Sequence, residues 1–398
     1  MAATASPDQT PHVPVLPTPC FITTDHELRS LLPELAQQPF LAIDTEANSL
    51  HAYQEQVCLI QLSTRTSDYL IDPLSIVDMD PLGDLLADPR LEKILHAAEY
   101  DLIGLRRDFG FFLRNVFDTM IAARVAGHSQ VGLGNLLERY LRVQTDKRHQ
   151  RDDWGRRPLS PASLRYAQMD THFLGMIRND LYDELQALGR LEEARDAFAE
   201  LDQLPAQAPR FDPDGFWRIG RPEGLNGRQM AILRAVYLWR EELAGQMDRP
   251  AFKVLGKDAM LELARRAPQT REELGRIRGM PRSLLRRHGE SLLQQIAAGK
   301  RAQTPAAPPR PARLEPVVRA RMLALREWRR QQALRRNLSS DVVFSKSVMM
   351  TLAQRAPRTM AELETVPGMG PWRLENYGPQ LLELLHGNCS DNGTGQAV

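Results

Sequence analysis

The chain has 398 residues, of which 42% are hydrophobic, and a net charge of +1, which indicates a soluble globular protein of two or three domains. No apolar run approaches the ~20 residues of a membrane helix, and the N-terminus lacks the basic start and apolar core of a secretory signal. Three scattered cysteines exclude a disulfide framework and a zinc site, and they favour a reducing, cytoplasmic location.

Strand and helix patterns alternate in the first half of the chain. Short apolar runs predict four strands, at residues 40–46, 56–63, 68–73 and 91–97. Helical patterns follow at residues 80–88, 99–110, 118–127 and 133–143. Residues 160–189 predict one further long helix, with Ser160 as its N-cap and Pro161 at its first position. This order predicts an α/β domain with a mixed sheet flanked by helices.

The second half is helical in pattern and contains an internal duplication. Residues 254–281 align without gaps with residues 343–370, 89 positions later, and Trp239 and Trp328 keep the same offset. A repeat of this length indicates two copies of a helical domain rather than a solenoid. We therefore expect a disordered leader at 1–18, the α/β domain at 19–205, a connector at 206–221, a first helical domain at 222–300, a Pro/Ala/Arg-rich linker at 301–315, a second helical domain at 316–387 and a disordered tail at 388–398.

Charge is divided unevenly between the two halves. Residues 1–200 hold 19 Lys and Arg against 30 Asp and Glu, whereas residues 201–398 hold 32 against 20. An acidic half joined to an arginine-rich half suits a metal-using catalytic domain tied to a polyanion-binding one. Two independently charged, solvated surfaces would give the same numbers, so charge alone leaves both interpretations open.

Acidic residues of the first half fall where they could share one site. Asp44 and Glu46 are two apart at the end of a predicted strand and point to the same face. Tyr166 and Asp170 are four apart on a predicted helix, and Asp101 lies near the start of another helix. In a two-metal site such carboxylates hold divalent ions ~3.5–4 Å apart, which activate a water and stabilise the leaving oxygen of a phosphodiester. Because a tyrosine has a pKa of about 10, Tyr166 would orient the water rather than deprotonate it.

These residues lie in motifs that resemble ribonuclease D, a family of the DEDD exonuclease superfamily. DTEANS (44–49), HAAEYDLIGL (96–105) and YAQMD (166–170) are similar to its three exonuclease motifs, and the tyrosine marks the tyrosine subclass. The resemblance implies an RNase H-like fold, two Mg²⁺ or Mn²⁺ ions, and hydrolysis from the 3′ end that releases 5′-mononucleotides. It also implies a role for each matching residue: metal ligands at Asp44, Glu46, Asp101 and Asp170, and water orientation by Tyr166.

The helical repeats resemble the domain shared by the C-termini of ribonuclease D and RecQ-type helicases, here called the HRDC-like domain. An exonuclease domain followed by two such domains is the architecture of bacterial ribonuclease D. This resemblance implies RNA as the partner, above all transfer RNA precursors whose 3′ ends are trimmed.

Basic residues at two places are candidates for substrate contact. Four residues precede the long helix: Lys147, Gln150, Trp154 and Arg157. They could hold substrate phosphates or, for the tryptophan, stack on a base. The same sequence pattern is also expected for a solvated loop that contains a packed tryptophan. In the first repeat, Arg278 and Arg282 flank a helix–glycine turn–helix unit whose N–H groups could meet a phosphate.

Three other residues are expected to have structural roles. The second repeat has only Arg373 near its own glycine turn, which favours packing there. We expect His96 to be a core or hydrogen-bonded histidine and Asp118 to cap a helix.

Together these observations predict a monomeric, metal-dependent 3′–5′ exoribonuclease that trims structured RNA with single-stranded 3′ tails and has no membrane association. A 3′–5′ exodeoxyribonuclease of the same fold is the nearest alternative, because no motif reads the 2′-hydroxyl. A nucleic-acid-binding protein without catalysis is a third possibility. It would be favoured if one of the five site residues were missing, but all five are present.

Overall fold

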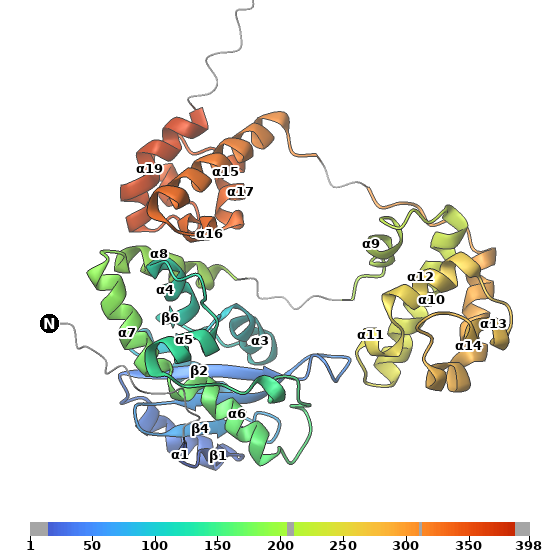
Figure 1. Cartoon of the computed structure of the whole chain (residues 1–398), viewed down its shortest axis with the longest axis horizontal. Helices are drawn as coiled ribbons and strands as arrows, with labels where there is room; N and C mark the ends of the chain where they lie inside the picture. Colours follow the sequence, from blue (N-terminus) through green and yellow to red (C-terminus); the bar gives the residue numbers. More distant parts are fainter. Residues whose placement is uncertain (1–14, 205–210, 310–312, 387–398) are drawn as a thin grey trace, which may run out of the picture. The chain divides into compact units, whose positions relative to one another are not determined.

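The structure, a computed structural model, describes residues 15–204, 211–309 and 313–386 (Figure 1). Within these ranges no helix is long and apolar enough to cross a membrane. Contacts divide the chain into two units: the first joins the α/β domain to the chain from Leu314 onward, and the second joins Ala47–Gln56 to Ala208–Arg313. The disorder predicted for the leader and the tail falls almost entirely outside the described residues.

The first unit contains a six-stranded mixed sheet in the order β1-β4-β3-β2-β5-β6. Its strands are β1 (Cys20–Ile22), β2 (Phe40–Ala47), β3 (Val57–Ser63), β4 (Asp68–Ile71), β5 (Glu92–Leu95) and β6 (Val116–Asp118). β2, β5 and β6 run parallel, whereas β3 and β4 pair antiparallel. The four predicted strands are confirmed. β1 and β6 have three residues each, too few to show a periodic pattern.

Helices cover both faces of the sheet. They are α1 (Asp25–Leu35), α2 (Asp80–Ala87), α3 (Glu99–Phe109), α4 (Thr119–Ala126), α5 (Leu133–Leu141), α6 (Pro161–His172), α7 (Leu174–Ala187) and α8 (Leu191–Ala199), with a short 3₁₀ turn at Lys147–His149. One core joins α1, α2 and α3 to residues such as Ile43 and Ile60 of the sheet. A second cluster joins Ala167 of α6 to Leu59 and Leu70. β3 is therefore buried along its whole length.

The single long helix predicted at residues 160–189 is wrong, because the structure has two helices there. Ser160 caps α6 by accepting from the Ser163 N–H, as predicted, but Phe173 ends α6 and starts α7. α6 packs on β3 and β4, and α7 packs on α4. At the start of α7 a Cβ on Gly175 would overlap the Phe40 ring. The two helices thus follow different surfaces, while the helical pattern of the sequence continues through the break.

Each helical repeat forms a bundle with its own core (Figure 1). The first contains α9 (Phe216–Gly220), α10 (Gly227–Gln246), α11 (Ala251–Val254), α12 (Lys257–Arg266), α13 (Arg271–Gly275) and α14 (Arg282–Arg301). The second contains α15 (Pro316–Arg336), α16 (Ser340–Val343), α17 (Lys346–Arg355), α18 (Met360–Glu364) and α19 (Pro371–His386). The predicted fold class is confirmed. α9 lies inside the segment expected as connector, and its Phe216 is fully buried in the first bundle.

Candidate active site

The end of β2 supplies the first two acids of the site. Asp44 and Glu46 alternate with Thr45 along the strand, so the two carboxylates share one face. Thr45 connects this strand to α3, because its N–H and its hydroxyl both donate to Asp101 Oδ1, at 3.1 and 2.6 Å. Asp101 lies in the first turn of α3 and is 6% exposed. The strand and the helix that were predicted to converge are thus joined directly at the site.

α6 brings the remaining two site residues to the same place. Ligand oxygens of Asp44, Glu46 and Asp170 lie within 4.8 Å of one another. Tyr166, one helical turn before Asp170, hydrogen-bonds to that carboxylate and lines the same hollow. The five residues predicted to form one site therefore do lie together, from three separate elements.

Burial and mutual repulsion shift the pKa values of these acids upward. Burial, reinforced by the charges of Asp101, Asp170 and Glu46, raises the pKa of Asp44 well above its usual range. Burial also raises the pKa of Glu46 to about 9. It raises those of Asp101 and Asp170 to about 7, although hydrogen bonds from Thr45 and Tyr166 act in the opposite direction. Burial and the neighbouring Asp170 raise the pKa of Tyr166, so its phenol stays protonated at neutral pH.

This donor set fits divalent metal ions. The charges that raise the pKa values of Asp44, Glu46 and Asp170 belong to neighbouring acids, and a partly desolvated group of like charges is unstable unless it is protonated or neutralised by cations. Carboxylate oxygens are the ligands that Mg²⁺ and Mn²⁺ prefer. The cluster found among the described residues, Asp44, Glu46 and Asp170, offers carboxylate oxygens as its ligand atoms.

The acids lie in a hollow of about 320 Å³ whose rim supplies groups able to contact a substrate. Lys147 and Gln150, both predicted as substrate contacts, line it. Tyr100, Leu133 and Gly134 line it as well. The sequence pattern does not single out the last two. The sequence signal for Tyr100 is its position directly before Asp101, and in the structure its side chain is 54% exposed.

The other two candidates from the basic cluster are engaged elsewhere. Arg157 forms an ion pair with the buried Asp72 at 2.7 Å and donates to the carbonyls of Cys58 and Trp154. Trp154 is 1% exposed and packs in the α6 cluster. These contacts favour structural roles for both residues, because neither side chain faces the hollow. Charge type in the sequence does not distinguish such an arginine from one that meets a phosphate.

Two neighbours of the acids have the structural roles expected. The Asp118 side chain caps α4 by accepting from the Met120 and Ile121 N–H groups. His96 Nδ1 lies 2.9 Å from the Thr119 hydroxyl, and burial lowers the pKa of His96 to about 4. His96 is therefore neutral and hydrogen-bonded. Arg278 and Arg282 lie in the second unit, Arg278 in the turn before α14 and Arg282 at the first position of that helix.

Comparisons with known proteins agree with this geometry. Residues 19–186 match the family model described as 3′-5′ exonuclease, and residues 229–296 and 318–385 each match the HRDC domain. A ribonuclease D from Granulibacter bethesdensis is 33% identical over 380 residues, covering 93% of each chain. A ribonuclease D from Gluconacetobacter diazotrophicus is 36% identical over 287 residues, covering 71% of this chain and 72% of that one.

A solved structure shows the same architecture. The crystal structure of Escherichia coli RNase D, described as an exoribonuclease involved in structured RNA processing, superposes with a TM-score of 0.65 at 29% identity and covers 93% of this chain and 99% of that one. These matches extend over the exonuclease domain and both helical domains, and over the acidic site within the first. We conclude that the chain belongs to the ribonuclease D family and is a metal-dependent 3′–5′ exoribonuclease.

Proposed function

We propose that the acidic hollow binds two divalent ions, Mg²⁺ or Mn²⁺, and removes nucleotides from the single-stranded 3′ tail of structured RNA such as a transfer RNA precursor. The observation that carries the proposal is the convergence of four carboxylates in one hollow, with Asp101 buried and Asp44, Glu46 and Asp170 half-buried, and with Asp152 and Asp118 adding further negative charge. Such a site is stable as an anionic cluster only when cations neutralise it.

Each residue has a distinct part in this reaction. When bound, the ions supply a nucleophilic water and stabilise charge on the phosphate and the leaving oxygen. Asp44, Glu46, Asp101 and Asp170 would hold the ions. Tyr166, protonated and hydrogen-bonded to Asp170, orients the attacking water. The water oxygen bonds to phosphorus as the bond to the 3′ oxygen of the preceding nucleotide breaks, and a 5′-mononucleotide leaves.

Lys147 and Gln150 are the proposed substrate contacts at the site. Both line the hollow and both are exposed at its rim, where they can reach a phosphate or sugar of the terminal nucleotide. Arg157 and Trp154 take no part in this proposal, because their polar groups and ring are committed to the protein interior. The monomeric state and the cytoplasmic location remain predictions of the sequence.

The test uses a 5′-labelled transfer RNA precursor with an unpaired 3′ tail, with Mg²⁺ or with chelator. The wild type is compared with Asp44→Ala and with Asp84→Ala, a control at an exposed aspartate of α2. Stepwise shortening from the 3′ end by the wild type and the control, absent in Asp44→Ala and in chelator, is the expected result. A matched DNA oligonucleotide runs alongside. Faster shortening of DNA than of RNA would support the exodeoxyribonuclease alternative, and equal activity of Asp44→Ala would refute the assignment of the site.

A further inference from the structure

The position of α6 on the sheet decides where two of the five site residues lie. α6 carries Tyr166 and Asp170, and both meet the acids of β2 in the hollow. Part of this helix packs on the sheet through apolar contacts, such as those in the cluster that contains Ala167 and Leu59. Apolar contacts have no preferred direction, so they do not by themselves fix how far a helix is turned or shifted along its axis.

A buried carboxylate on β4 supplies contacts that do have a direction. Asp68 Oδ2 accepts a hydrogen bond from Gln168 Nε2 at 2.6 Å and lies 2.8 Å from His172 Nδ1. Asp68 Oδ1 accepts from the Ser63 hydroxyl of β3 at 2.7 Å, and the Ser63 oxygen lies 2.7 Å from the Thr171 hydroxyl. Three residues of α6 are thus joined to the sheet through this one carboxylate and its serine neighbour.

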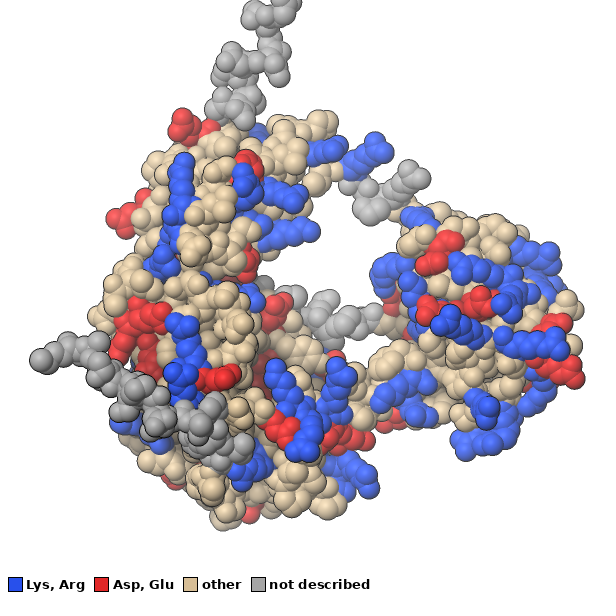
Figure 2. Space-filling view, in the orientation of Figure 1, with Lys and Arg blue, Asp and Glu red and all other residues tan. Residues whose placement is uncertain are grey.

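Asp68 is ionised although it lies inside the protein. Many acidic side chains of this chain lie at the surface (Figure 2), whereas Asp68 is only 5% exposed. Burial acts to raise the pKa of Asp68, but hydrogen bonds from His172, Gln168 and Ser63 lower it below its usual value. The carboxylate is therefore charged at neutral pH, and hydrogen bonds to a charged acceptor are about twice as strong as those between neutral groups.

The contacts to Asp68 fix both the rotation and the axial position of α6. The other α6 residues that take part lie three and four positions after Gln168, so they share one face of the helix with it. Tyr166 and Asp170 share a different face, because each residue turns the helix by about 100°. A shift of α6 by one residue would move Asp170 about 1.5 Å along the axis and break the directional bonds to Asp68. The position that satisfies Asp68 is therefore the position that brings Asp170 to the acids of β2.

We propose that Asp68 is a positioning residue for the exonuclease reaction. From outside the metal site it holds α6 in the register that presents Asp170 and Tyr166 to the ions and the attacking water. The described residues that line the hollow do not include Asp68, so it acts through the helix and not on the substrate. A misplacement of about 1 Å in such a site can cost about 100-fold in rate. The inference rests on the proposed function, because that function gives Asp170 and Tyr166 their roles.

The test uses four variants of the full-length protein. Asp68→Ala removes the acceptor. Gln168→Met keeps the length of the α6 side chain and removes its hydrogen bonds to Asp68 and to the Pro17 carbonyl. Asp68→Asn is the conservative variant: its oxygen can accept from Gln168 and His172 while its amide nitrogen donates to Ser63, so the network persists without the charge.

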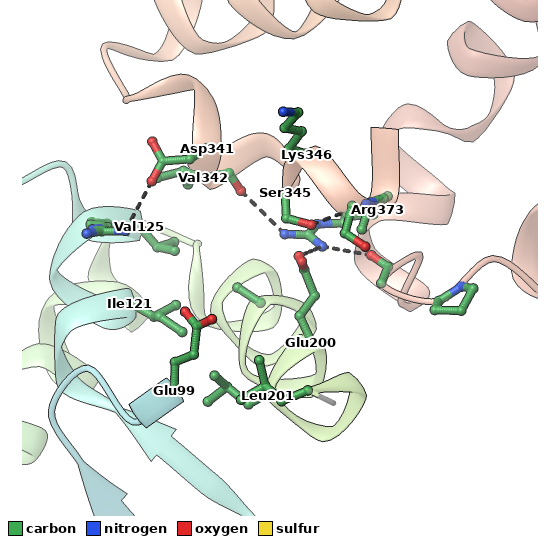
Figure 3. Close-up of a pocket in the computed structure, with 17 residues that line it drawn as sticks. Glu99, Ile121, Val125, Glu200, Leu201, Asp341, Val342, Ser345, Lys346 and Arg373 are labelled. Carbon is green, nitrogen blue, oxygen red and sulfur yellow. Dashed lines mark hydrogen bonds and ion pairs between the residues drawn. The ribbon is translucent and has the colours of Figure 1, made fainter. Parts of the chain in front are cut away.

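Glu200→Gln is the control for a general loss of stability. Glu200 forms an ion pair with the buried Arg373, and Figure 3 shows the pair on the wall of a cavity of about 480 Å³ in the first unit. The pair joins the 3₁₀ turn after α8 to α19, and both residues lie outside α6 and the hollow. Its loss should lower the melting temperature and leave the active site unchanged.

Three properties of each variant are measured: Mn²⁺ binding without RNA by electron paramagnetic resonance, melting in chelator, and kcat and KM on a short single-stranded RNA in Mg²⁺. We expect Asp68→Ala and Gln168→Met to lower kcat about 10- to 100-fold and to weaken Mn²⁺ binding about tenfold. KM should change little, because Lys147 and Gln150 of the rim lie in the segment before α6. Asp68→Asn and Glu200→Gln should stay near the wild type in kcat and in Mn²⁺ affinity.

The inference is overturned if folded Asp68→Ala and Gln168→Met keep the kcat and Mn²⁺ affinity of the wild type, because Asp68 then supports only the fold. It is also overturned if Glu200→Gln loses as much activity at an equal loss of melting temperature, or if Asp68→Asn fares no better than Asp68→Ala. Gln168→Met decides if Asp68→Ala does not fold. A wild type that neither binds Mn²⁺ nor cleaves RNA would instead show that the proposed function itself fails, and the inference with it.

Discussion

Replacing Arg373 by leucine should loosen the second helical domain from the exonuclease domain, because the ion pair between Arg373 and Glu200 is lost. The arginine is 1% exposed and contacts Glu200 and the carbonyls of Gly368 and Val342. Leucine is the residue at the equivalent position of the first copy, Leu284, where it packs in the core of the bundle. A leucine therefore suits this position of the helix, and the substitution removes the ion pair with Glu200 together with the hydrogen bonds to the carbonyls of Gly368 and Val342.

The size of the effect follows from the burial of the pair. Removing one partner of a buried ion pair costs about 3–5 kcal/mol, because the other charge is left without compensation. The Glu200 side chain is 20% exposed, so water partly solvates its charge in the variant. We therefore expect the free energy that holds the contact to fall by about 3 kcal/mol, the lower end of this range. At 1.4 kcal/mol per factor of ten, the equilibrium constant for undocking rises about 100-fold.

Hydrogen exchange measures this opening directly, because amide protection reports local free energies of opening. We expect exchange of the amides at the start of α19 and in the turn before it to accelerate about 100-fold relative to the wild type. Arg358→Leu, at an exposed arginine of the same domain, is the control. Equal acceleration in both variants, or acceleration confined to the first helical domain, would refute the reasoning that the Arg373 pair holds the contact.

Three further outcomes are expected. Tyr166→Phe should lower kcat by about 100-fold or more with KM and metal affinity little changed, since only the water-orienting hydroxyl is lost; an equal loss of metal affinity would contradict that role. In chelator, the folded protein binds more protons than the unfolded chain between about pH 4 and 7, because burial raises the pKa of Asp101 and Asp170 to about 7. Stability without metal should therefore fall as the pH rises through this window, and Mg²⁺ should raise the melting temperature more at pH 8 than at pH 5; an equal increase at both would count against the acid cluster as the metal site. Gly299→Ala should destabilise the first helical domain by about 1–3 kcal/mol in urea unfolding, because its Cβ would lie 2.7 Å from the Ile232 Cα where α10 and α14 cross, and an unchanged midpoint would show that the crossing can relax.

Local sequence signals were sufficient to predict which side chains of the proposed site share a face of one strand or one helix. Asp44 and Glu46 share a face because the side chains of a strand alternate, and Tyr166 and Asp170 share one because a helix repeats every 3.6 residues. These periodicities depend only on backbone geometry. The N-caps at Ser160 and Asp118 were predictable for the same reason, since a cap bonds to an N–H two or three residues away.

Residues whose role depends on distant partners could not be assigned in this way. Arg157 has the same charge and nearly the same position in the chain as Lys147, yet Arg157 pairs with Asp72, 85 residues away, while Lys147 lines the hollow. The break between α6 and α7 is likewise set by the surfaces that the two helices cover, because the apolar pattern runs through Phe173 without interruption. Both outcomes depend on contacts between segments far apart in the sequence.

The duplicated turn separates the two kinds of information most clearly. The sequence alone determined that two copies exist, that each contains a glycine turn and that only the first is rich in arginine. Only the tertiary structure decided that, in the second copy, the N–H of Arg373 at the start of α19 donates to the carboxylate of Asp196, 177 residues earlier in the chain. A helix N-terminus attracts any anion, so which anion it holds is decided by what the folded chain places beside it.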